Sequence, residues 1–286
     1  MKYCAIILIA VGTLSLPAQD EQGEVRTRRI WDLNLQQKRV EARKSATEAT
    51  HKKSGATVEA KTANDDYIGV TLWRFRPSRG QDAPSARLLV HDPDSDTEAE
   101  WTPERSMASA PLREGQKVRL SIESARQGYL YVIDREQYAD GSFGDAEMIF
   151  PTQKMRHSSN QVQAGRVVDI PATGDGSFRV QRSRKDQVAE ELTILVCPTP
   201  LEGVKIGIKP LAVSKEQLAE WKKSWGAAFK QLEERDAVGR TYTQAERDAS
   251  DKGTLLGDTD PLPQTMFEVK AAPGNPLMVT MPLRIE

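Results

Sequence analysis

The chain has 286 residues, of which 28% are charged and 38% hydrophobic, and its formal net charge is -1. These values are typical of a globular protein with one large or two modest domains. They exclude a fibrous chain and a strongly basic protein specialised for binding nucleic acid.

The first residues predict a secretory signal peptide over residues 1–18. Lys2 supplies the positive charge, and Cys4–Leu16 form an apolar run. The alternative is an uncleaved membrane anchor, but the run is shorter than the roughly 20 residues that a spanning helix needs. We expect cleavage near Gln19 and export to the periplasm or the extracellular space. Cleavage would leave Cys197 as the one cysteine, which excludes an intramolecular disulfide and, in its apolar surroundings, predicts a buried thiol.

Residues 19–64 form a polar segment in which basic residues outnumber acidic ones over the first part. We interpret the segment as a solvated, flexible tether. The alternative is a basic arm that grips an anionic polymer of the envelope, in which case binding would weaken steeply as salt rises.

From residue 65 onward, short apolar runs separated by Gly, Pro, Asp and Ser predict a series of β-strands. In Gln116–Ser124, apolar residues alternate with Lys117, Arg119 and Ser121, which predicts a strand with one solvated face. Many short strands with frequent turns predict an antiparallel β-sandwich over residues 65–201. The predicted strands are 68–76, 86–92, 116–124, 128–134, 146–151, 165–171, 177–183 and 192–198.

After residue 201 the apolar period becomes helical. Ser214 begins a predicted helix that ends near Gly239, and Thr243 begins a second one that Gly253 ends. We interpret the aromatic stripe of the first helix as core packing. Residues 202–286 are therefore predicted to form a helical hairpin and C-terminal strands that pack on the sandwich. The predicted fold class is mainly β, an antiparallel β-sandwich with a helical hairpin near the C-terminus, and α+β overall.

The sequence predicts no catalytic centre and no cofactor. Its histidines are His51, His91 and His157, and none has a neighbour at a spacing that suggests a catalytic triad or a zinc site. We therefore expect a protein that is not an enzyme. The alternative is a hydrolase that uses dispersed carboxylates.

The segment 136–147 has two interpretations. As a calcium loop it places Asp140 and Glu147 at ligand positions 5 and 12, with Glu136 at the first position. Glutamate replaces the usual aspartate there, Tyr138 cannot serve as a carboxylate, and the flanks are strands by composition. A metal site at Glu136, Asp140 and Glu147, and with it a calcium-stiffened structural module, is the alternative. A second acidic stretch, His91–Glu100, is interpreted as a solvated turn.

As part of a β-hairpin, the same segment joins two paired core strands through an Asp-Gly turn. Tyr138 and Phe143 in this loop are either packed caps over the end of the sandwich or contacts for a partner. We predict them as candidate partner-binding residues. The strands are predicted to place Tyr129, Tyr131, Ile133, Met148 and Phe150 in or against the core.

Several stretches occur in a characteristic order: IGVTLWRFRPS, PLREGQKVRLSIES, GYLYVIDREQYADGS, IFP, AGRVVDIP and LTILVCPTPL. In these features the segment from Ile68 to about Leu201 resembles a family of bacterial exported domains whose name records only that their function is unknown. The C-terminal helical part looks like an extension found in envelope members of that family. The resemblance implies an accessory sensing or binding unit, since similar domains accompany peptidase-like or kinase-like modules. No catalytic residues are assigned to the family.

Together these features predict an exported, non-catalytic accessory or binding protein of the bacterial cell envelope. It is expected to recognise a protein or glycan partner, with no nucleic acid and no transmembrane segment after signal cleavage.

Overall fold

The computed structural model describes residues 66–286 except 93–96, 155–158, 173–175, 258–259 and 273. The predicted signal peptide over 1–18 and the predicted tether over 19–64 lie outside the described residues, as do His51 and His157.

The described residues form strands connected by short loops, with two α-helices near the C-terminus. The helices are α2 (Lys215–Trp225) and α3 (Gln244–Lys252), and Pro84–Ala86 form the 3-10 helix η1. The strands are β1 (Asp66–Pro77), β2 (Leu88–Asp92), β3 (Thr97–Ser106), β4 (Lys117–Ser124), β5 (Gly128–Tyr138), β6 (Ala146–Phe150), β7 (Gln161–Val162), β8 (Val167–Ile170), β9 (Phe178–Arg179), β10 (Gln187–Cys197), β11 (Leu211–Val213), β12 (Phe229–Glu233), β13 (Thr265–Val269) and β14 (Leu277–Arg284).

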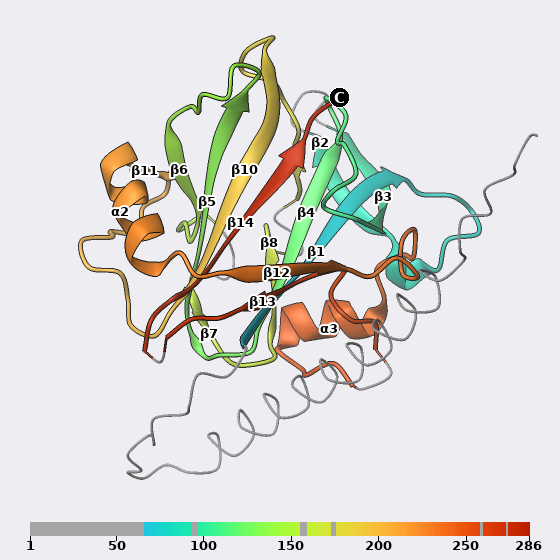
Figure 1. The fold of residues 1–286 in the computed structure, drawn as a ribbon. Coiled ribbons are helices and arrows are strands. Elements are labelled where there is room, and N and C mark those ends of the chain that lie inside the picture. Colours follow the sequence, from blue (N-terminus) through green and yellow to red (C-terminus); the bar gives the residue numbers. More distant parts are fainter. Residues whose placement is uncertain (1–65, 93–96, 155–158, 173–175, 258–259, 273) are drawn as a thin grey trace, which may run out of the picture. The chain divides into compact units, whose positions relative to one another are not determined.

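The strands make two antiparallel sheets (Figure 1). In the first sheet, β4 pairs with one edge of β1, while β13 and then β3 pair with the other edge. Strand β12 extends this sheet beyond β13, β2 extends it beyond β3, and β8 and β9 pair with β4. The second sheet has the order β11-β6-β5-β10-β14, with β7 beside β5. The predicted antiparallel β-sandwich is confirmed.

The main core lies between the two sheets and is built by the period-two alternation of strands from both. Ile68 and Leu72 of β1 meet Val132 of β5 and Ile194 of β10 in one buried cluster, which Phe150 of β6 joins. Removing these side chains from water is the main stabilising contribution to such a fold. Strands β13 and β14, near the C-terminus, belong to different sheets, so the C-terminal segment closes the same core.

The outer face of the second sheet carries a separate apolar cluster, which α2 covers. Tyr131, Ile133 and Met148 are buried there beneath Trp221, and Tyr129 packs against them half-buried. The predicted packing of the hairpin residues and of the helical aromatic stripe is therefore confirmed.

Strand β4 differs from its prediction because both of its faces are buried. Lys117, Arg119, Ser121 and Glu123, which alternate with the apolar positions, are each no more than 8% exposed. The alternation correctly identified the inner face. The outer face is polar yet covered, because other strands supply partners for its polar groups. Glu123 accepts a hydrogen bond from the Tyr67 hydroxyl of β1, and Ser121 donates to Asp169 of β8. The Lys117 ammonium lies over the Trp101 ring of β3.

The first helix is shorter in the structure than the sequence predicts. Ser214 caps α2 by accepting a hydrogen bond from the Gln217 amide, as expected, but the helix ends at Trp225 and Gly226 adopts an extended conformation. Phe229–Glu233 then form β12 instead of continuing the helix. Pairing with β13, and the edge-on contact between Phe229 and Phe267, outweigh the local helical pattern.

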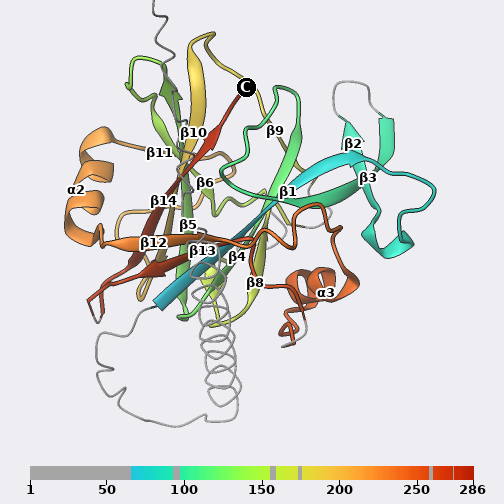
Figure 2. The ribbon, with the colours of Figure 1, turned by 45° about the vertical axis from the view of Figure 1, so that its right-hand side comes forward.

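The predicted helical hairpin is also wrong as an arrangement. Helix α2 packs on the second sheet at β14, whereas α3 packs on the first sheet at β8, and β12 separates them in the chain. Figures 1 and 2 show the two helices on different sides of the sheets. Neither helix in the described part of the chain is long and apolar enough to cross a membrane.

The acidic stretch after residue 91 was predicted as a solvated turn, but its described part is strand. Residues 97–106 form β3, which pairs with β2 on one side and β1 on the other. The acidic side chain of Glu100 is exposed, whereas Thr102 is fully buried and Trp101 packs against an apolar cluster that contains Trp73. A strand tolerates such a sequence because only alternate residues face the covered side.

Gly69 provides a test of how tightly the C-terminal segment lies on β1. A Cβ at this position would overlap the ring of Pro263, whereas a Cβ at Gly80 would meet nothing within 4 Å. We expect Gly69→Ala to lower the free energy of unfolding by about 1–3 kcal/mol, because overpacking a buried contact displaces the segment. Gly80→Ala should stay within about 0.5 kcal/mol of the wild type. Urea denaturation measures both, and equal stabilities would contradict the close contact.

Candidate functional site

The loop between β5 and β6 is an ordered turn. The Gly141 amide donates to the Tyr138 carbonyl oxygen at 2.9 Å, and Gly141 takes a positive φ of 82° that favours glycine. The Asp140 carboxylate accepts hydrogen bonds from the amide of Ser142 at 2.8 Å and from its hydroxyl at 2.6 Å. These bonds hold the Asp-Gly turn in the manner of an Asx turn.

The two aromatic residues of this loop are covered by arginine side chains. The guanidinium of Arg184 lies 3.9 Å from the ring centroid of Tyr138, and that of Arg135 lies 3.6 Å from the ring centroid of Phe143. Tyr138 is only 7% exposed, and its hydroxyl donates to the Glu136 carboxylate. The side chains predicted to contact a partner therefore take part in cation–π packing within the molecule. Their role as partner contacts stays a prediction.

The carboxylates of the alternative metal site serve different local purposes. Glu136 accepts from Tyr138, Asp140 holds the turn, and Glu147 is exposed on β6. Within the described residues, no group of three or more His, Cys, Asp or Glu side chains is arranged to hold a metal ion. The flanks are strands, as the hairpin interpretation expected.

A different acidic group lies at the same end of the sandwich. Asp134 stands opposite Leu192 across β5 and β10, and Glu190 stands opposite Glu136. Leu192 belongs to the core between the sheets, so the three carboxyl groups continue its inward-facing row. No local pattern in the sequence indicates this group, because the register of β5 against β10 is set by contacts between residues about 50 or more positions apart.

The environment of these carboxyl groups favours their neutral forms. Burial raises the pKa of Asp134 to about 7, with the charges of Glu136 and Glu147 adding to the effect. Burial and the charge of Asp134 raise the pKa of Glu190 to about 8. The Gln187 amide donates to one Glu190 oxygen at 2.7 Å, while the other Glu190 oxygen and one Asp134 oxygen are buried without a partner among the described residues. Like charges on neighbouring strand positions destabilise a sheet, which accounts for the retained proton.

A groove of about 710 Å³ opens at the opposite end of β5. Its walls come from the start of β5, the turn region around β7, strand β8 and the C-terminal end of α3. The polar side chains along it are mainly amides and hydroxyls, and they come from segments that are far apart in the sequence. The lining residues are Gln127, Gly128, Tyr129, Ser159, Gln161, Val162, Gln163, Arg166, Val167, Val168, Asp169, Pro198, Ser250, Asp251, Lys252 and Gly253.

Three glutamines give the groove its chemical character. Gln127, Gln161 and Gln163 are all exposed within it. Each glutamine amide offers two donors and an acceptor, so the groove can satisfy a ligand that both donates and accepts hydrogen bonds. These amides can bind a polar ligand by hydrogen bonds and carry no charge of their own.

Helix α3, which forms one wall of the groove, begins and ends as the sequence predicted. Thr243 and Glu246 form a capping box at its start, and Gly253 takes a left-handed conformation with φ of 67° at its end. These reciprocal hydrogen bonds satisfy amide groups that have no partner inside the helix. The helix therefore has a defined length, and its C-terminal turn, Ser250–Gly253, reaches the groove.

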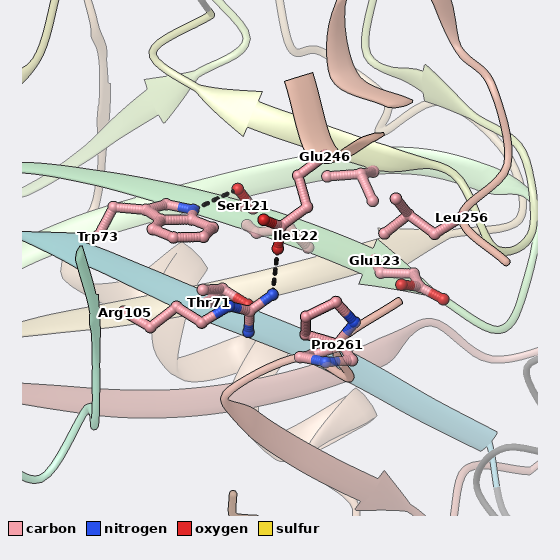
Figure 3. A pocket seen from close by; sticks show the side chains of 11 residues that line it. Thr71, Trp73, Arg105, Ser121, Ile122, Glu123, Glu246, Leu256 and Pro261 are labelled. Carbon is pink, nitrogen blue, oxygen red and sulfur yellow. Dashed lines mark hydrogen bonds and ion pairs between the residues drawn. The ribbon is translucent and has the colours of Figure 1, made fainter. Parts of the chain in front are cut away.

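Buried polar contacts attach the helical segment to the first sheet. Glu246 forms an ion pair with Arg105, and the Trp73 ring nitrogen donates to the Ser121 hydroxyl at 2.7 Å (Figure 3). The Ser121 hydroxyl in turn donates to Asp169, which also accepts from the Tyr242 hydroxyl at 2.6 Å. A cavity of about 20 Å³ beside the ion pair has room for a single water molecule. The wall of the groove is thus fixed to the sheet that carries β8.

Cys197 lies in the cluster under α2 and is 2% exposed. Burial raises the pKa of its thiol to about 12, which keeps the thiol protonated and unreactive. The predicted buried thiol is confirmed.

Residues 111–197 match the model of a family described as a domain of unknown function (DUF4384). The match runs from β4 to β10 and includes parts of both sheets, but β1 and β14, which pair with those two strands, lie outside it. This match agrees with the resemblance to a domain of unknown function that the sequence motifs indicate, but it covers fewer residues than the segment from Ile68 to about Leu201. No curated protein and no solved structure matches the chain.

The raised pKa values predict a stability that falls as pH rises. Both carboxyl groups hold their protons more tightly in the folded state, so the stabilisation is complete below about pH 4 and is lost as pH passes the folded pKa values of about 7 and 8. Glu190→Gln removes one charge and keeps the oxygen that Gln187 contacts. We expect it to match the wild type near pH 4 and to be more stable by about 1–3 kcal/mol at pH 8.5.

Denaturant unfolding at a series of pH values measures this difference. Glu202→Gln, at an exposed position outside the acidic group, is the matched control and should follow the wild type throughout. A Glu190→Gln variant that loses stability in parallel with the wild type between pH 5 and 8.5 would contradict the retained proton.

Proposed function

We propose that this chain is an exported, non-catalytic binding protein of the bacterial cell envelope, and that the groove beside α3 takes a segment of a glycan. The observation that carries the proposal is the lining of the groove by glutamine amides and hydroxyl groups. Its volume of about 710 Å³ lies in the range of small-molecule and oligomer sites. Hydroxyl-rich sugars need several paired donors and acceptors, which amide side chains supply.

The same lining favours a glycan over a protein partner. The centre of a protein interface is usually depleted in charge and built on large apolar or aromatic anchors. In the groove, the exposed side chains are mostly polar, with amides on Gln127, Gln161 and Gln163 and charges on Asp251 and Lys252. Tyr129 is half-buried against the cluster under α2, so its ring is partly engaged in packing.

Export is supported by the apolar run at Cys4–Leu16 and by the resemblance to exported domains. An accessory role is supported by that resemblance, which implies a unit that recognises a ligand for another protein. The matched family carries no assigned activity, and the groove chemistry fits recognition of a polar ligand without turnover.

A hydrolase is the second candidate, and the acidic group at the other end of the sandwich favours it. Asp134 and Glu190 have raised pKa values and lie beside Glu136, and a pair of neighbouring carboxyl groups is the arrangement of acid–base hydrolysis. Both groups lie on the inward-facing row of the sheet and are at least half-buried, which limits access for a polymer. If the wild type hydrolyses a glycan or a peptide and Glu190→Gln abolishes this turnover, the protein is a hydrolase and the binding proposal is wrong.

The glycan proposal is tested by retention of the full chain on immobilised, purified envelope polysaccharides and cell-wall glycan. The variant Gln161→Ala/Gln163→Ala removes two amides from the groove, and Gln231→Ala removes an exposed amide from β12 as a control. We expect the double variant to bind about tenfold more weakly, since each lost hydrogen bond contributes about 0.5–1.5 kcal/mol. Unchanged affinity of the double variant, or no retention of the wild type on any glycan, would refute the proposed site.

A further inference from the structure

Arg166 occupies a distinct position at one end of the groove. The turn before β8 brings its backbone amide to within 3.2 Å of the Gln163 carbonyl oxygen, to which it donates. Its side chain lies directly on Gly253, where a Cβ would overlap the guanidinium nitrogens. Arg166 is half-buried and lines the groove together with Gln163.

The Arg166 guanidinium has no anionic partner among the described residues. The neighbouring Lys252 pairs with Asp248 at 3.0 Å, and Asp251 is exposed on the same helical turn without an ion pair to Arg166. Elsewhere in the described chain, half-buried arginines such as Arg76 and Arg135 are paired with carboxylates. Arg166 is therefore a cation that faces an open groove.

We infer that the groove selects glycan chains that carry an anionic group, a carboxylate or a phosphate, and that Arg166 binds this group. The inference rests on the proposed function and names the class of glycan. A guanidinium presents a planar fork of donors that fits carboxylate and phosphate oxygens, and such charge-assisted hydrogen bonds are about twice as strong as neutral ones. The exposed amide of Gln163 lines the groove beside it and can bind the hydroxyl groups of the same sugar unit.

A structural role competes with this inference. The last carbonyl groups of a helix attract cations, so Arg166 could serve only to stabilise the end of α3 at Gly253. Such a role would affect folding stability and would not distinguish anionic from neutral polymers. The test therefore measures both quantities.

The experiment measures binding of the full chain to dextran as a neutral polymer, polygalacturonate as a carboxylated one and poly(glycerol phosphate) as a phosphate-bearing one. The variants are Arg166→Gln and Arg166→Lys, with Arg113→Gln as the control. Arg113 carries the same charge on an 80% exposed side chain, outside the groove. Every variant keeps the basic residues of segment 19–64, so attraction of anionic polymers to that segment is equal in all of them.

We expect Arg166→Gln to weaken binding of one or both anionic polymers by about tenfold or more, to leave dextran binding unchanged and to keep the melting midpoint of Arg113→Gln. Arg166→Lys keeps the charge but loses the planar fork of donors, so its affinity for the anionic polymers should lie between those of the wild type and Arg166→Gln. The polymer with the larger loss identifies carboxylate or phosphate as the preferred group.

Equal affinity of Arg166→Gln and Arg113→Gln for both anionic polymers would overturn the inference. So would an equal loss for dextran, or a loss that follows a lowered melting midpoint, because either result assigns Arg166 to the structure of the wall. If the wild type binds dextran as tightly as the anionic polymers, the glycan proposal stands and the anionic selection fails. If it binds no glycan, both fail.

Discussion

The fully buried carboxylate of Asp169 is the interaction on which the arrangement of the C-terminal segment depends. Burial raises the pKa of this group, while Arg119, Ser121 and Tyr242 act in the opposite direction by charge and hydrogen bonds. A buried carboxylate without such partners is strongly destabilising, so the sheet needs the Tyr242 segment as much as that segment needs the sheet. The buried ion pair between Arg105 of β3 and Glu246 of α3 is a second case in which a charge on the sheet has its partner on the C-terminal segment.

This dependence has a consequence for the groove. Asp169 lies on β8, and Tyr242 leads directly into α3, so their hydrogen bond holds the helix beside the strand that lines the groove. The segment matched by the family model supplies one wall, and the C-terminal segment outside the match supplies the other. In the proposed binding function, both segments would therefore contact the ligand.

The two ends of β5 show different solutions to the burial of polar groups. At its start, exposed amides line an open groove. At its other end, Asp134 and Glu190 lie on a covered face without enough donors, and protonation replaces ion pairing. Nearby, Arg135 bonds Glu191 and stacks on Phe143 on the outer face, so the positive charge is directed away from the acidic row. The strand alternation places these two groups of charges on opposite faces of the sheet.

The amino-acid sequence by itself determined the features that depend on near neighbours. The alternation of Val118, Leu120 and Ile122 identified an inner face, the cap signatures of Ser214 and Thr243 marked where the helices begin, and Asp140-Gly141 marked the turn of a hairpin. Only the tertiary structure decided the features that depend on pairing between distant segments. Phe229–Glu233 became a strand because β13 was available to pair with it. Arg119 was buried because Asp169 and the Gly176 carbonyl oxygen, which come later in the chain, supplied its partners. The groove and the acidic row were invisible for the same reason, since their members meet through strand register and helix docking, which local sequence patterns do not encode.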